Sequence, residues 1–185
     1  KPKIIALIAN TNEGKSNMLY HILFKLKELN ANLYAYGLRK EIEGIKAVYS
    51  LTEIEQIKNS ILIIDEFYSI FDIDNRKEKR NIESVLRLIN HNNNIILLFG
   101  LPENMKKFIS AKVNAFIFKK SSIADFINGS RAKNVLLSYR GMELGSTILE
   151  LPINEALIFD GYHYSKVNVP YIKETDTKAD NLPII

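Results

Sequence analysis

Cysteine is absent from this 185-residue sequence, and its absence removes three kinds of chemistry. Without thiols the chain has no disulfides, no thiolate ligands for a metal and no cysteine nucleophile. Such a composition agrees with the reducing environment of a cytoplasm. We therefore expect a cytoplasmic protein, located in the host cytoplasm if the protein is viral.

Long apolar segments and a strong charge imbalance are absent as well. A membrane-spanning helix needs about 20 apolar residues, and no run in the sequence approaches that length. The short apolar opening leads directly into Asn, Thr and Glu residues, so we expect neither a membrane span nor a secretory signal. The net charge is only +4, which permits a nucleic-acid partner but does not indicate one by itself.

What the sequence does contain is an alternation of short, wholly apolar segments with segments of helical periodicity. We expect strands at residues 3–9, 32–38, 60–67, 93–100 and 114–120, and helices at residues 17–29, 50–57, 77–90 and 103–112. Strands that are apolar on both faces are typical of a parallel sheet covered by helices on both sides. The chain length and its 46% hydrophobic content suit one such domain.

The last third of the sequence changes character. Residues 134–152 and 156–170 read as paired antiparallel segments, the second with Asp160-Gly161 at its turn. The polar residues that follow show no periodicity. We expect one domain at residues 1–172, followed by a tail or linker at residues 173–185. The helix at 50–57 opens with a capping-box pattern, in which Ser50 or Thr52 precedes Glu53 or Glu55.

The segment "ANTNEGKS", residues 9–16, has the context of a phosphate-binding loop, because it joins a strand to a helix. In such a loop backbone N–H groups face an anion, a Lys reaches the β- and γ-phosphates, and a Ser or Thr hydroxyl binds Mg²⁺. The pattern calls for Gly where this chain has Ala9, at the end of the strand. The candidate nucleotide-binding residues are Ala9, Asn10, Thr11, Asn12, Glu13, Gly14, Lys15, Ser16 and Asn17. The structural alternative is a solvated turn with Ser16 as the helix N-cap.

A second motif, "ILIIDE", strengthens this interpretation. An apolar strand that ends in an acid is where a nucleotidase of this type holds the Mg²⁺ shell, and Asp65 occupies that position. Glu66 follows directly and is placed to act as the general base that activates water. The candidate metal ligands are therefore Ser16 and Asp65, and the candidate catalytic residues include Lys15 and Glu66. The structural alternative is a pair of solvated carboxylates at the end of a strand.

Two further elements of a nucleotide-driven motor are harder to find. A polar side chain that senses the γ-phosphate should follow the strand at 93–100, but Gly100, Leu101 and Pro102 cannot act in this way. Glu103 and Asn104 are the nearest polar residues, and capping of the next helix is the favoured role of Asn104. A ring-forming ATPase also needs an arginine supplied by a neighbouring subunit, for which Arg131 is one candidate among several arginines.

Taken together, "ANTNEGKS", "NLYAYGL", "ILIIDEFYSIF" and "NNIILLFGLPENMKKFISAKVNAFIF" resemble, in order and spacing, small ATPases of the FtsK/HerA superfamily. The resemblance implies an α/β P-loop NTPase fold of the RecA/ASCE-like type, with a mainly parallel sheet, flanking helices and antiparallel hairpin additions at the C-terminal end. It implies ATP and Mg²⁺ as cofactors, and a homo-oligomeric ring, hexamer or pentamer, that pumps double-stranded DNA. The family usually carries a Gln at the sensor position, where this chain has Leu101 or a neighbour.

The function that these features favour is ATP-driven translocation of DNA, in viral genome packaging or mobile-element transfer. Its partners would be double-stranded DNA and a viral portal, capsid or transfer-apparatus protein. One alternative is a P-loop ATPase for phage assembly or secretion, similar to the zonula-occludens-toxin-like proteins. Another is a nucleotide-binding assembly module without hydrolysis, which Ala9 and the absent sensor favour and the intact Lys15, Ser16, Asp65 and Glu66 oppose. A small-molecule kinase fits less well, because no acceptor site or arginine-rich lid is evident.

Overall fold

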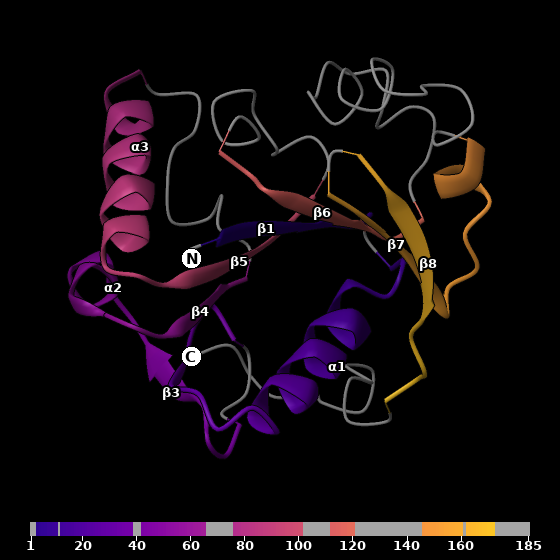
Figure 1. The fold of residues 1–185 in the computed structure, drawn as a ribbon, viewed down its shortest axis with the longest axis horizontal. Coiled ribbons are helices and arrows are strands. Elements are labelled where there is room, and N and C mark those ends of the chain that lie inside the picture. The colour runs from indigo at the N-terminus through magenta and orange to yellow at the C-terminus, as the bar shows by residue number, and fades with distance from the viewer. Residues whose placement is uncertain are drawn as a thin grey trace.

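The computed structural model describes residues 3–10, 12–38, 42–65, 76–101, 112–120, 146–160 and 162–172. Figure 1 shows strands and helices that alternate through most of the chain. The elements are β1 (Lys3–Ile8), α1 (Lys15–Lys27), β2 (Leu33–Tyr36), β3 (Lys46–Val48), α2 (Leu51–Gln56), β4 (Ile61–Ile64), α3 (Arg76–His91), β5 (Ile95–Gly100), β6 (Ala115–Phe118), β7 (Glu155–Phe159) and β8 (Tyr164–Asn168). None of the helices in this part of the chain is both long and apolar enough to cross a membrane.

The strands form one sheet in the order β3-β2-β4-β5-β1-β6-β7-β8. All pairs from β3 to β6 in this order are parallel, whereas β7 pairs antiparallel with both β6 and β8. This arrangement confirms the predicted α/β fold, a mainly parallel sheet with an antiparallel hairpin added at its C-terminal end. It also places β1, which leads into the "ANTNEGKS" segment, between β5 and β6 in the sheet.

Alternate residues of the inner strands enter two separate cores, one on each face of the sheet. On β1, Ile4 and Ile8 belong to one core and Leu7 to the other. Helix α1 covers the face of Leu7 with Met18, Leu19 and Leu23, and α2 and α3 cover the opposite face. Full burial of a Leu or Ile side chain stabilises a fold by about 1.5–3 kcal/mol, so both layers contribute strongly.

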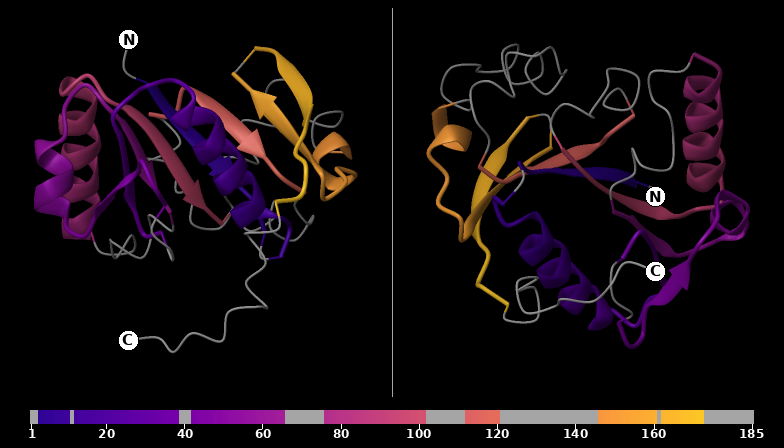
Figure 2. Two further views of the ribbon diagram at one scale, coloured as in Figure 1. Left: turned by 90° about the horizontal axis from the view of Figure 1, so that it is seen from below. Right: turned by 180° about the vertical axis from the view of Figure 1, so that it is seen from behind.

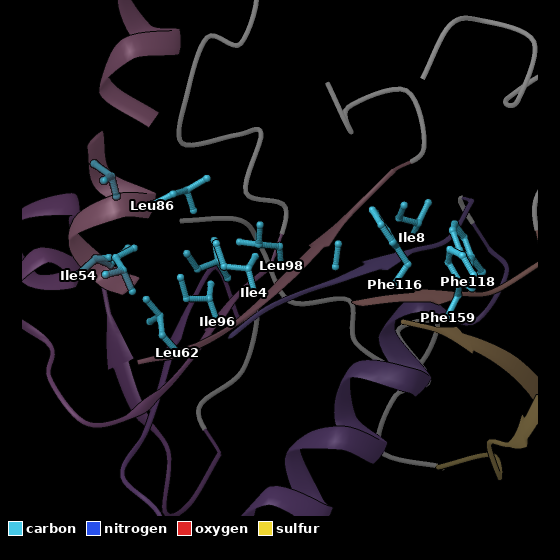
Figure 3. Packing of buried hydrophobic residues seen from close by; sticks show 14 of the residues in the cluster. Ile4, Ile8, Ile54, Leu62, Leu86, Ile96, Leu98, Phe116, Phe118 and Phe159 are labelled. Carbon is cyan, nitrogen blue, oxygen red and sulfur yellow. The ribbon is translucent and has the colours of Figure 1, made fainter. Parts of the chain in front are cut away.

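Figure 3 shows the core on the α2 and α3 face from close by. Ile54 of α2 and Leu86 of α3 gather with the strand residues Leu62 and Ile96. At the other end of the same core Phe116 and Phe118 stack with ring centroids 5.7 Å apart. Val85, Leu86 and Ile89 of α3 are buried in this core, at the spacing of one face of a helix.

One predicted antiparallel segment is wrong over the residues that the structure describes. Residues 146–149 form a helical turn instead of a strand, with the Glu150 N–H donating to Ser146 O at 3.1 Å. Ile148 and Leu151 are both buried, and their spacing of three residues suits a helix. Residues 134–145 of that segment, residues 103–111 of the helix expected at 103–112, and the tail at 173–185 lie outside the described residues.

The β7–β8 hairpin, in contrast, agrees with the prediction. Its turn is stabilised by Asp160, whose Oδ1 accepts hydrogen bonds from the N–H groups of Tyr162 and His163 at 2.9 and 2.8 Å. These backbone donors lower the pKa of the Asp160 carboxyl. Because β7 runs antiparallel to β6, the turn lies at one edge of the sheet and the start of β7 lies at the other, where β6 ends.

Candidate functional site

The carboxyl ends of the parallel strands lie along one edge of the sheet, where ligand sites of α/β folds occur. Residues that directly follow the strands are joined there by backbone hydrogen bonds. The Ala9 N–H donates to Gly100 O at 3.4 Å, and the Lys119 N–H donates to Ile8 O at 2.9 Å. The Asp65 N–H donates to Tyr36 O at 2.9 Å. The sheet therefore fixes the positions at which the loop after β1 starts and Asp65 follows β4.

The described residues of the loop after β1 include two left-handed backbone conformations. Asn12 and Gly14 adopt left-handed backbone angles, with φ of 66° and 80°, and the Glu13 N–H donates to Asn10 O at 3.2 Å. Ala9 does not adopt a positive φ and is fully buried in the core beneath α1. Nothing at this position demands a glycine, so the departure of Ala9 from the usual motif is compatible with the loop.

Helix α1 begins at Lys15, and Gly14 is its N-cap. The first hydrogen bond of the helix runs from the Met18 N–H to Gly14 O at 3.0 Å, so the N–H groups of residues 15–17 lie outside the helical ladder. Gly14 has no side chain that could cap this end, and the first turn of the helix contains no acidic residue. The alternative in which Ser16 caps the helix is therefore wrong, since Gly14 is the N-cap. Backbone N–H groups at a helix start of this kind favour an anion.

Lys15 and Asp65 come together across the end of β5. Lys15 Nζ lies 3.1 Å from Asp65 Oδ1, and the two side chains are only 14% and 11% exposed. Because the two groups lie this close together, a magnesium phosphate bound here could contact both of them, the phosphate through the Lys15 ammonium and the metal through the Asp65 carboxylate. The structure thus unites two residues that the sequence places 50 positions apart.

The donors around this pair fit a magnesium ion. Among the described residues no three His, Cys, Asp or Glu side chains cluster as a protein-only metal site. Mg²⁺ is commonly held by one or two carboxylates together with phosphate oxygens and water, and does not require such a cluster. The carboxylate of Asp65 and the hydroxyl of Ser16, on the first turn of α1, are hard oxygen donors of the required kind.

Lys119 is a buried cation beside the loop that the sequence analysis missed. Its side chain is fully buried at the end of β6, and its Nζ donates to the backbone oxygens of Ile153 and of Glu155, the latter at 2.7 Å. A Cβ added to Gly14 would lie 3.4 Å from Lys119 Cε. Burial lowers the pKa of Lys119, and the charges of Glu13 and Glu155 oppose that shift. In sequence, Lys119 differed in no way from the exposed Lys120 next to it.

Asn17 is the second contact that the sequence did not reveal, although Asn17 itself was a candidate. Its Nδ2 donates to Pro170 O at 2.9 Å, and its Oδ1 accepts from the Ile172 N–H at 2.7 Å. The residue directly after Ser16 therefore holds the segment that follows β8. No local sequence signal could predict a bond between residues 155 positions apart.

Several predicted site residues lie outside the described part of the chain. They are Thr11, Glu66, Arg131, Glu103 and Asn104. The strand on which a sensor was expected, β5, does lie between β1 and β4, as the motif order requires. Neither its last residue, Gly100, nor Leu101, which follows it, has a polar side chain.

No family model and no curated protein matches this chain. Solved structures do match. The DNA-packaging ATPase B204 of Sulfolobus Turreted Icosahedral Virus superposes with a TM-score of 0.68 at 16% identity, over 92% of this chain and 99% of that one. The genome-packaging NTPase B204 of Sulfolobus turreted icosahedral virus 2, in complex with ATP-gammaS, gives a TM-score of 0.67 at 14% identity, over 92% and 98% of the two chains.

A bacterial protein shows the same likeness over part of its length. ATPases 2 and 3 of EssC from Geobacillus thermodenitrificans match with a TM-score of 0.55 at 10% identity, over 93% of this chain and 37% of that one. At such low identities the likeness concerns the fold. This chain therefore has the P-loop ATPase fold that the motifs predicted, and it shares that fold with genome-packaging ATPases.

Proposed function

We propose that this chain is an ATP-hydrolysing motor that translocates double-stranded DNA, in viral genome packaging or mobile-element transfer. The observation that carries the proposal is the Lys15–Asp65 pair at 3.1 Å, beside the N-terminus of α1. The likeness to B204, described as a DNA-packaging ATPase, supports the choice of DNA as the substrate that is moved.

Binding would begin at the helix end. The N–H groups of residues 15–17 and the loop backbone would hold the phosphates, and Lys15 would exchange Asp65 for the β- and γ-phosphate oxygens. Ser16 and Asp65 would hold Mg²⁺, which neutralises charge on the phosphates.

Hydrolysis would depend on Glu66 and Arg131, both of which are assigned from the sequence. Glu66 follows Asp65 directly and would accept a proton from the attacking water. Arg131 is our candidate for a charge supplied by the neighbouring subunit of a ring, where it would stabilise the transition state. We propose a homo-oligomeric ring, hexamer or pentamer, that docks on a portal, capsid or transfer-apparatus protein.

Steady-state ATP hydrolysis with and without linear duplex DNA tests this function. We expect duplex DNA to raise the turnover of the wild type, with a stimulation that weakens as salt increases. Glu66→Gln should reduce turnover about 10²–10⁴-fold, because a general base contributes that much. Glu150→Gln, at an exposed carboxylate outside the predicted motifs, is the control and should hydrolyse like the wild type.

The other functions predict different results in the same assay. An ATPase that acts on protein, for phage assembly or secretion, would hydrolyse ATP without responding to DNA. A nucleotide-binding assembly module would bind ATP and show no turnover in either protein. Either result would contradict a DNA translocase.

A further inference from the structure

Two segments outside the predicted motifs lie against the start of α1. One is the loop before β7, where a Cβ added to Gly14 would lie 3.5 Å from Ile153 O and 3.6 Å from Ile153 Cγ1. The other follows β8, where Asn17 binds the backbone of Pro170 and Ile172. Gly14 and Asn17, which flank Lys15 and Ser16, are thus in contact with the two segments that lead into and out of the β7–β8 hairpin.

The two segments also bind each other. The Val169 N–H donates to Asn154 O at 2.6 Å, and Asn154 Nδ2 lies 3.4 Å from Asn168 Oδ1. Leu151 and Val169 are each only 1% exposed, and they anchor the two segments in different cores, Leu151 in the one on the α2 and α3 face and Val169 in the one beneath α1. The backbone of residues 151–154 and 168–172 is therefore a fixed wall beside the phosphate loop.

This wall presents apolar side chains to solvent. Ile153 is 61% exposed and Tyr171 is 68% exposed, although their neighbours Leu151 and Val169 are buried. Tyr171 lies between Pro170 and Ile172, the two residues that Asn17 holds, so the backbone that carries its ring is fixed against α1. An exposed aromatic residue and an exposed aliphatic residue thus lie on the two segments that contact Gly14 and Asn17, at the start of α1.

A nucleoside triphosphate needs such a surface. When its phosphates occupy the loop and the N-terminus of α1, its ribose and base must continue past the loop. The base is flat and largely apolar on its faces, and it binds best where an aromatic ring stacks on it. The wall is held to Gly14 and Asn17, at the two ends of the phosphate-binding turn.

We propose that Tyr171 and Ile153 form the nucleoside subsite, with the base stacked on the Tyr171 ring and Ile153 packed against the ribose or base. This inference rests on the proposed function, because it requires a nucleotide in the loop. It assigns a role in nucleotide binding to the C-terminal hairpin, whose residues lie far in sequence from "ANTNEGKS".

Calorimetric titration with Mg·ATP and, separately, with Mg·tripolyphosphate tests the subsite. Tripolyphosphate carries the charge of the triphosphate without a nucleoside. Tyr171→Ala should weaken ATP binding about tenfold and Ile153→Ala about threefold, while binding of tripolyphosphate stays unchanged. Tyr171→Phe keeps the ring and should bind ATP within about twofold of the wild type.

Tyr162→Ala is the matched control, because Tyr162 is 83% exposed and lies at the opposite end of the same hairpin. Its ATP affinity should equal that of the wild type. If Tyr171→Ala binds ATP normally, or loses ATP and tripolyphosphate equally, the subsite is wrong and the proposed function stands. If the wild type binds neither compound, the phosphate site itself is wrong and both proposals fail.

Discussion

At the scale of residues, the structure adds to the two sequence motifs a direct contact between Lys15 and Asp65. Both residues were predicted as ligands from the sequence, but their direct contact depends on β4, β5 and β1 lying side by side. The side chains are 14% and 11% exposed, which places the pair between a solvated surface bridge and a fully buried one. Surface pairs contribute about 0–1 kcal/mol, and breaking a fully buried pair costs about 3–5 kcal/mol.

A double-mutant cycle with Lys15→Met and Asp65→Asn measures this pair. Because each single change leaves one poorly solvated charge behind, we expect a coupling free energy of unfolding of about 1–2 kcal/mol. Urea unfolding of the wild type, both single variants and the double variant gives the value. Losses that add without coupling would mean that the two charges do not interact in solution.

Lys119 gives the fold a dependence on pH. Its pKa is lowered by burial from an unfolded value of 10.5, so between the two values the unfolded chain binds more protons than the folded one. Stability must therefore rise as pH increases through this window toward 10.5. Lys119→Met abolishes that rise, and it also removes the donor to the oxygens of Ile153 and Glu155.

The measurement is urea unfolding at about pH 8 and about pH 10. The free energy of unfolding of the wild type should increase relative to Lys119→Met as pH rises. Lys120→Met, at the exposed neighbouring lysine, should follow the wild type at both values. A difference between wild type and Lys119→Met that shrinks with pH would contradict the direction of the shift.

At the scale of elements, the sequence predicted a capping box at the start of α2 but did not determine which residue is the cap. The sequence offered Ser50 or Thr52 as the cap. The structure selects Ser50, whose Oγ accepts from the Glu53 N–H at 3.2 Å, while Glu53 Oε2 accepts from the Tyr49 N–H at 3.3 Å. Ser50→Ala should lower the free energy of unfolding by about 1 kcal/mol. Thr52→Ala, at an exposed position inside the helix, should change it much less, and equal losses would argue against this cap.

The turn after β2 packs against the backbone of Asp65, one of the candidate site residues. Gly37 has a φ of 80°, and a Cβ there would lie 2.6 Å from the backbone oxygen of Asp65. Gly37→Ala should therefore cost about 2–4 kcal/mol, from a strained backbone and a clash with main chain. It should also weaken ATP binding, because Asp65 must move.

Gly44 provides the comparison that isolates the clash. Its φ of 82° is as unfavourable for alanine, but its added Cβ would meet the flexible Lys27 side chain, with Cε at 3.3 Å. Gly44→Ala should cost about 1 kcal/mol and leave ATP binding unchanged. Thermal or urea unfolding of the two variants checks this, and equal costs would show that the contact with Asp65 is unimportant.

The elements that could be predicted are those with a strong pattern. Wholly apolar runs located β1, β4, β5 and β6, and the helical spacing of buried residues located α1 and α3. The three-residue strand β3 was missed because Lys46 and Ala47 are exposed and carry no strand pattern. The turn at 146–149 was predicted wrongly because two apolar residues, Ile148 and Leu151, are too short a pattern to distinguish a strand from a helical turn.

At the scale of the whole molecule, the sequence predicted a sheet covered by helices on both faces but not which strands lie next to each other. Strands apolar on both faces required helices on both sides, and the two cores confirm this. The order of strands and the return of residues 168–172 to the start of α1 depend on contacts between distant segments, which no local pattern encodes. Those contacts produce the features missing from the sequence account, namely Lys119 beside Gly14 and the wall that carries Tyr171.

The central claim is that the turn from Gly14 to Ser16, with Asp65 beside it, binds a magnesium triphosphate. Equilibrium binding of Mg·ATP to the wild type, Lys15→Ala and Lys25→Ala tests it most directly. Lys25 lies on the same helix, is 64% exposed and pairs only with Glu28 among the contacts the structure describes, so Lys25→Ala controls for loss of a charge. We predict that Lys15→Ala weakens binding at least about tenfold, because a charge-assisted contact is lost, and that Lys25→Ala binds normally. Equal affinity of Lys15→Ala and the wild type would contradict the site.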